Sequence, residues 1–318
     1  MVNRRSVTAR APPDYDPAVT DAAKLPPPPE GIPETSSRSR PCPSCRQAVT
    51  SRFCPDCGES PAAAEERSLR RFLFGWFNAT TSLDGRFLGS FGALIRRPGL
   101  LTSEYLQGVR KRRLSPMQIV LFANLFFFIA QSASNAAVLN TSYRSHLNQQ
   151  IYSPLAQRFA RDELAARGIP EAEFQRRFDR RADEASRTLV LVMVPMFALL
   201  FAALRLPGRR GAVEHMAFAA EYVAFATSYV LCGLFGIYAL LVSASKRGLP
   251  DEVVGAAFIA LPFVLFAIVA TWLAAAFRRL YGDRLRSAAL RAGLACLLSI
   301  VPLTGYRFVL FLLALKTA

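Results

Sequence analysis

Residues 96–130 read RRPGLLTSEYLQGVRKRRLSPMQIVLFANLFFFIA, and the organisation of the whole chain follows from this stretch. Four consecutive basic residues, 110–113, lead directly into the first strongly apolar segment. About 20 apolar residues are needed to cross the hydrocarbon core of a bilayer, and the segment 117–139 is long enough. Basic residues beside a span are retained in the cytoplasm. The stretch therefore predicts a membrane protein with a cytoplasmic N-terminal part.

The composition agrees with one membrane domain and a small appendage. Hydrophobic residues make up 52% of the 318 residues and occur in long blocks. The formal net charge of +16 would favour nucleic acid as the partner of a soluble protein. Here much of the charge flanks the apolar blocks, where membrane orientation and attraction to anionic lipid headgroups explain it. We expect the lipid bilayer as a partner and do not expect nucleic-acid binding.

Further apolar segments follow the first, and the charges between them support one topology. Arginines occur between the second and third segments and again between the fourth and fifth, which places both loops on the side of the N-terminus. The sequence predicts an all-α polytopic membrane protein of about five spans, with its C-terminus outside. The membrane domain comprises residues 117–315, with spans at 117–139, 188–204, 216–242, 253–277 and 288–315 and an external helical loop at 140–187.

Two Cys-x-x-Cys pairs, Cys42/Cys45 and Cys54/Cys57, precede the membrane domain. Each pair places two thiolates on one side of a tight turn, and two such turns complete a tetrahedral four-sulfur shell for Zn²⁺. The competing interpretation is a redox pair, which would need a surrounding βαβ pattern that the sequence lacks. A site closed by four thiolates is structural, and metal binding supplies its folding free energy. We predict a zinc ribbon over residues 40–60.

The segments on either side of the ribbon differ in character. Residues 1–39 contain four consecutive prolines at 26–29 and predict a disordered tail, which acts as a tether or docks a partner. Residues 66–116 combine amphipathic helices with a basic connector, because apolar residues recur at helical spacing between 68 and 97. That stripe fits a helix lying in the membrane interface and equally one packed on the bundle.

Polar residues of the first span are candidates for an intramembrane site, since burying such groups in lipid is costly. Asn124, Gln131 and Asn135 occupy one narrow sector of the predicted helix. Amides in this position commonly hold helices together. The alternative is that they line a path for a substrate.

Glu221 and Tyr222 are the corresponding candidates in the third span. The carboxyl group of Glu221 could hold a proton or cation, or it could pair with an arginine such as Arg278 or Arg279. The sequence contains no Gly-rich phosphate loop, no nucleophile elbow and no His-Glu-x-x-His motif. We therefore predict no catalytic residues and no enzymatic activity.

Sections of the N-terminal half match a known pattern. They are residues 42–45, 53–58, 97–99, 104–111 and 114–116. Over roughly residues 40–135 the chain resembles a bacterial inner-membrane family described only as a domain of unknown function, whose members carry an N-terminal zinc ribbon before several spans. The resemblance implies a zinc ribbon and a multi-span membrane domain, and it carries no activity.

The leading functional hypothesis is an inner-membrane protein whose cytoplasmic ribbon is an interaction or regulatory module for a cytoplasmic protein partner. A closed metal site on a tether can present a small rigid surface. The alternative is a small-solute or ion transporter or channel, with a polar path through spans one and three. A membrane enzyme ranks third, because no catalytic constellation supports it.

Overall fold

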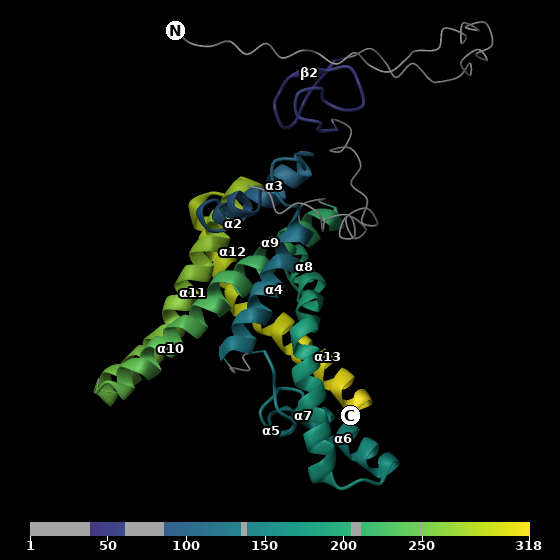
Figure 1. Cartoon of the computed structure of the whole chain (residues 1–318), viewed down its shortest axis with the longest axis vertical. Helices are drawn as coiled ribbons and strands as arrows, with labels where there is room; N and C mark the ends of the chain where they lie inside the picture. Colours follow the sequence, from purple (N-terminus) through teal and green to yellow (C-terminus); the bar gives the residue numbers. More distant parts are fainter. Residues whose placement is uncertain (1–38, 61–85, 135–138, 205–210, 249) are drawn as a thin grey trace, which may run out of the picture. The chain divides into compact units, whose positions relative to one another are not determined.

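The computed structural model describes residues 39–60, 86–134, 139–204, 211–248 and 250–318 (Figure 1). Within these ranges the chain is mainly helical. Two short strands, β1 (Arg40–Pro41) and β2 (Ala48–Val49), pair antiparallel in the ribbon. The predicted all-α membrane class with an N-terminal four-cysteine cluster is confirmed. The predicted tail up to residue 38 and residues 61–85 lie outside the described residues.

The helices follow one another through short connections. Their bounds are α2 Arg86–Arg96, α3 Leu100–Leu106, α4 Pro116–Ser134, α5 Tyr143–Asn148, α6 Ser153–Arg167, α7 Glu171–Thr188, α8 Met193–Leu204, α9 Ala212–Phe225, α10 Cys232–Lys246, α11 Asp251–Tyr281, α12 Leu285–Leu298 and α13 Ile300–Thr317. A 3₁₀ turn, Leu189–Val192, separates α7 from α8. A π-helical segment, Ala226–Leu231, joins α9 to α10.

Three stretches of the described chain are long and apolar enough to cross a membrane: Ala212–Ser243, Glu252–Tyr281 and Leu285–Thr317. The pair α7 and α8 passes the same test only as a broken span, because the two helices are bent by 67°. The apolar part of α4, Pro116–Gln131, is shorter than these spans. The sequence predicted about five spans; length and composition support three in the described residues, or four with the bent pair.

Helix α9 is the centre of the main core, because nearly all of its side chains are buried. It packs against both α4 and α8. Its alanines permit this close approach, since small side chains let helix backbones come together in membranes. These alanines are Ala217, Ala219, Ala220 and Ala224.

Helix α2 packs on the bundle. Leu94 is fully buried, and its carbonyl accepts a hydrogen bond of 2.7 Å from the indole N–H of Trp272. The hydroxyl of Tyr229 donates to the carbonyl of Phe91 at 2.8 Å. Of the two placements that the apolar stripe allowed, the described part of this segment adopts packing on the bundle.

The predicted helical loop at 140–187 folds into α5, α6 and α7, which share a second apolar core with α13. The ring of Tyr143 contacts Phe174 and Phe178 at centroid distances of 5.7 and 5.3 Å, and Phe178 contacts Phe311 at 5.8 Å. His146 is fully buried among these rings. Its Nδ1 lies 2.7 Å from the hydroxyl of Tyr152.

The buried His146 should make this second core sensitive to acid. Burial, together with the smaller effect of the Arg307 charge, lowers the pKa of His146 to about 4. The unfolded-state value is about 6.5, so the folded state binds fewer protons. The contribution of neutral His146 to the free energy of unfolding is complete above pH ~6.5. Roughly 3 kcal/mol of this free energy is lost as the pH falls toward 4. Unfolding of the full chain in detergent at pH 7 and pH 4.5 measures this loss.

The matched control is His146→Gln, which cannot titrate but keeps a polar group facing Tyr152. We expect the drop in stability between pH 7 and pH 4.5 to be smaller in this variant than in the unmodified chain. Glu163, whose pKa is lowered by hydrogen bonds from Lys316 and Arg167, is present in both proteins and cancels in the comparison. An identical pH dependence in the two proteins would contradict the assignment.

Candidate metal centre and buried carboxylate

The four predicted cysteine ligands come together. The Sγ atoms of Cys42, Cys45, Cys54 and Cys57 all lie within 4.8 Å of one another. Cys42 and Cys57 are 3.5 Å apart, and so are Cys45 and Cys54. A tetrahedral Zn²⁺ with Zn–S bonds of about 2.3 Å requires sulfurs separated by about 3.8 Å. The donor set and its spacing therefore fit a closed tetrahedral metal site.

Each Cys-x-x-Cys pair lies on a tight turn, called a knuckle, and the two knuckles have the same local geometry. This geometry explains how eight intervening residues can bring the two cysteine pairs together. In the first, the N–H of Arg46 donates to the carbonyl of Cys42 at 2.9 Å, and Arg46 has φ 68°. In the second, the N–H of Gly58 donates to the carbonyl of Cys54 at 2.8 Å, and Gly58 also has φ 68°. Glycine adopts this left-handed conformation at no steric cost, whereas arginine does so at some cost.

The ribbon contacts the basic connector through Glu59, a residue that the sequence did not single out. Its side chain is 2% exposed, and its Oε2 accepts hydrogen bonds of 2.9 Å from the backbone N–H groups of Arg110 and Lys111. The carbonyl of Glu59 accepts a hydrogen bond of 2.7 Å from the N–H of Cys54. Glu59 therefore belongs to the second knuckle and also to the connector contact.

Glu221 is fully buried and binds the N-terminus of α3. Its Oε1 accepts a hydrogen bond of 2.9 Å from the N–H of Gly99. Its Oε2 accepts from the N–H of Thr102 at 2.8 Å and from the Thr102 hydroxyl at 2.5 Å. The first N–H groups of a helix have no partner within the helix, and a carboxylate there also interacts favourably with the helix dipole. Glu221 thus acts as the N-cap of α3 from a distant helix, because Gly99 has no side chain to do so.

The predicted pairing of Glu221 with Arg278 or Arg279 does not occur. Arg279 instead donates through Nη1 to the carbonyl of Pro98 at 2.6 Å. Both contacts hold the Arg97-Pro98-Gly99 turn against the bundle. Glu221 does not need an arginine partner, because backbone N–H groups at a helix start satisfy a buried carboxylate without burying a second side-chain charge.

Gly99 is required at this turn for two reasons. Its φ is 77°, in the left-handed region that favours glycine. A Cβ at this position would lie 3.1 Å from the side chain of Leu280 and 3.2 Å from the backbone of Ala276. The turn therefore packs directly on the last part of α11.

The remaining intramembrane candidates are distributed differently. Tyr222 is 5% exposed, and its ring packs against Phe197 and Phe201 at centroid distances of 4.9 and 5.5 Å. Gln131 is buried and Asn124 is half-buried, as expected for a helix face directed toward the bundle. Asn135 lies outside the described residues.

Fold and site together define a helical protein with several helices long and apolar enough to span a membrane, and with an N-terminal four-cysteine cluster that could hold a metal ion. Residues 84–128 match the model of a protein family of unknown function, DUF3667. No curated protein and no solved structure matches the chain. The matched range contains α2, α3, the connector and the first part of α4, so it includes the groups that Glu59 and Glu221 bind.

Proposed function

We propose that this chain is a non-enzymatic protein of a bacterial inner membrane, and that its ribbon holds Zn²⁺ in the cytoplasm as a regulatory and interaction module. The observation that carries the proposal is the contact of Glu59 with Arg110 and Lys111. Without metal a unit this small does not fold, so the position of Glu59 depends on the metal. In this proposal the ribbon binds the connector only when it holds metal, and it is also a small domain on a tether.

Further contacts continue from the connector to the membrane helices. Arg113 forms an ion pair with Glu104 of α3 at 2.7 Å and donates to the carbonyl of Gly89 in α2 at 2.8 Å. The N–H of Leu114 donates to the hydroxyl of Ser90 at 3.0 Å. Because Glu221 binds α3 to α9, a change in the ribbon has a continuous set of contacts through which to act on the bundle.

The outer surface of the ribbon offers a place for a cytoplasmic protein partner. Phe53 is 55% exposed, which is high for a large aromatic side chain, and the guanidinium of Arg52 lies 5.6 Å from its ring centroid. Aromatic residues, Phe among them, and arginine are enriched at protein–protein interfaces relative to the rest of the surface. The transporter alternative has less support, because Glu221, its central residue, already accepts three hydrogen bonds from Gly99 and Thr102.

Glu59→Ala should separate metal binding from coupling. Metal content should stay at the unmodified level, because no ligand is changed. The amides of Arg110 and Lys111 should exchange hydrogen about 10- to 100-fold faster, since each loses a bond to a charged acceptor. Hydrogen-exchange mass spectrometry of the full chain measures this effect, with Asp56→Asn, an exposed acid of the same ribbon, as the control.

Affinity purification of crosslinked cells expressing these variants then tests the module. A partner that is lost in the double variant Cys42→Ser/Cys45→Ser but retained in Glu59→Ala would place docking on the ribbon surface, with Glu59 serving regulation. If the double variant keeps both its partners and its physiological effect, the ribbon is not the functional module.

A further inference from the structure

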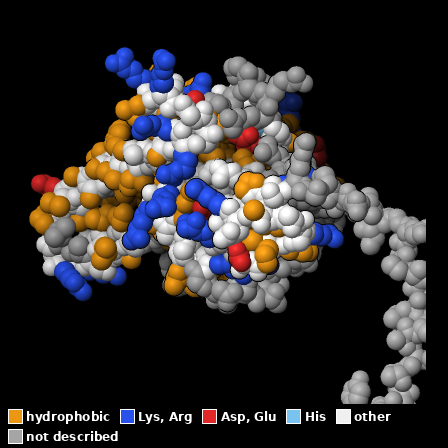
Figure 2. Space-filling model, turned by 90° about the horizontal axis from the view of Figure 1, so that it is seen from above, with side chains coloured by type: hydrophobic (Ala, Val, Ile, Leu, Met, Phe, Trp, Pro, Cys, Tyr) orange, Lys and Arg blue, Asp and Glu red, His pale blue; other side chains and the backbone are white. Residues whose placement is uncertain are grey.

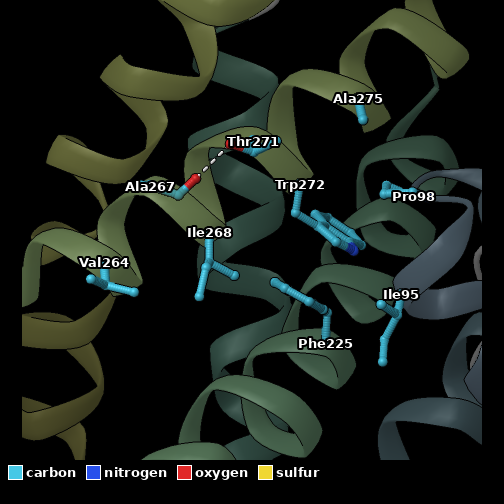
Figure 3. A pocket seen from close by; sticks show the side chains of 9 residues that line it. All are labelled: Ile95, Pro98, Phe225, Val264, Ala267, Ile268, Thr271, Trp272 and Ala275. Carbon is cyan, nitrogen blue, oxygen red and sulfur yellow. Dashed lines mark hydrogen bonds between the residues drawn. The ribbon is translucent and has the colours of Figure 1, made fainter. Parts of the chain in front are cut away.

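An apolar groove runs along α11 and differs from both sites described above. It has a volume of about 640 Å³ and is lined by residues of the α2–α3 corner, α9 and α11 (Figure 3). Single organic ligands occupy hollows of about 300–1,000 Å³. The lining residues are Ile95, Pro98, Phe225, Val264, Ala267, Ile268, Thr271, Trp272 and Ala275.

The polar atoms of the groove wall are already satisfied. The hydroxyl of Thr271 donates to the carbonyl of Ala267 at 2.7 Å (Figure 3). The indole N–H of Trp272 donates to the carbonyl of Leu94. The rings of Trp272 and Phe225 stack at 4.6 Å. The wall therefore presents hydrocarbon and aromatic surface, which suits an acyl chain and offers nothing to a polar ligand.

A basic hollow of about 420 Å³ adjoins one end of the groove, and the two share Ala275. Arg278 and Arg279 line this hollow. Arg279 is bound to the carbonyl of Pro98, which itself lines the groove, whereas the exposed guanidinium of Arg278 has no hydrogen bond or ion pair within the described residues. Arg278 is thus available to an anionic group at the mouth of an apolar groove.

The negative charges near this hollow are compensated. Asp283, which also lines it, is bound by both carboxylate oxygens to Arg291 at 2.8 and 2.7 Å. The C-terminus of α11 carries a partial negative charge of about half an electron, which two arginines exceed. Seen from the end that carries α2 and α3, many Lys and Arg side chains gather beside an extensive hydrophobic surface (Figure 2).

We propose that this site binds one anionic phospholipid, with an acyl chain in the groove beside Trp272 and the phosphate on Arg278. A basic pocket at the headgroup end of an apolar groove is complementary to both parts of such a lipid. The neighbouring Arg96 and Arg97 line another basic hollow of about 390 Å³ and favour anionic over zwitterionic headgroups at this end.

Trp272 provides a local probe, since the chain contains only one other tryptophan, Trp76. The full chain carrying Trp76→Phe is reconstituted in vesicles of phosphatidylcholine with increasing amounts of brominated phosphatidylglycerol. We expect quenching of Trp272 at a several-fold lower mole fraction of brominated lipid than with brominated phosphatidylcholine. Arg278→Gln should reduce this preference about fivefold. Arg286→Gln, an exposed arginine at the same end, should leave it unchanged.

Ala275→Leu places a larger side chain where the two hollows meet and should weaken quenching by both lipids. Added inorganic phosphate should leave the quenching unchanged, because the acyl chain holds the lipid in the groove. Equal quenching by the two lipids in the Trp76→Phe chain without further substitutions would mean that the groove only faces bulk lipid and would overturn the proposal. Absence of quenching, together with crosslinks between copies at Val264 or Ile268, would assign the groove to a second copy and overturn it as well.

Discussion

The substitution Cys54→Ser is expected to abolish metal binding and to unfold residues 40–60. Structural Zn²⁺ contributes roughly 10–16 kcal/mol of apparent binding free energy in units of this kind, and the ribbon has only Val49 and two of its cysteines as a buried apolar core. Metal analysis of the purified full chain should fall from about one Zn²⁺ per chain to near zero.

The control for this experiment is Cys296→Ser, which removes a thiol of α12 that lies outside the ribbon. It should keep the metal of the unmodified chain. The helices should remain inserted in both variants, because their hydrophobicity is unchanged. Full metal content in Cys54→Ser would contradict a four-thiolate site, and a metal other than zinc in the unmodified chain would correct its identity.

Glu221→Ala is expected to destabilise the membrane domain by about 3–5 kcal/mol, because each buried donor left without an acceptor costs about 1–3 kcal/mol. The variant leaves the N–H groups of Gly99 and Thr102 and the Thr102 hydroxyl without their acceptor in a buried place. Thermal unfolding of the full chain in detergent measures the loss, and the exchange rates of the two amides locate it at the start of α3. Glu221→Gln should be intermediate, because its amide retains one acceptor oxygen but turns an NH₂ group toward donors.

Thr102→Val makes a matched comparison. It removes the hydroxyl bond but keeps the N–H bond, so the expected loss is about 1 kcal/mol. The double variant with Glu221→Ala should be less destabilised than the sum of the two, because the contact is shared. Additive losses would show that Glu221 acts elsewhere. Altered ion or solute flux in Glu221→Gln at unchanged stability would favour the transporter alternative.

The pattern of the cysteines was sufficient to predict that the four thiols come together, because each of the two turns is built from hydrogen bonds that span four or five residues. The hydropathy of the chain was likewise sufficient to predict its class, since the cost of burying polar groups in lipid depends on composition over one helix length. The number of spans was less predictable. The bend between α7 and α8 depends on how α13 and α4 pack around it, and the hydropathy of a segment does not contain that information.

What the sequence determined by itself was local: the four-cysteine ligand set, the apolar helices and the basic residues beside them. What only the tertiary structure decided was which partners the buried carboxylates have. Glu221 binds groups 119 and 122 residues earlier in the chain, and Glu59 binds groups 51 and 52 residues later. A carboxylate accepts hydrogen bonds from backbone N–H groups as readily as from arginine, and every residue except proline carries such a group. The packing of α3 on α9 selects the partners of Glu221, and the contact of the ribbon with the basic connector selects those of Glu59.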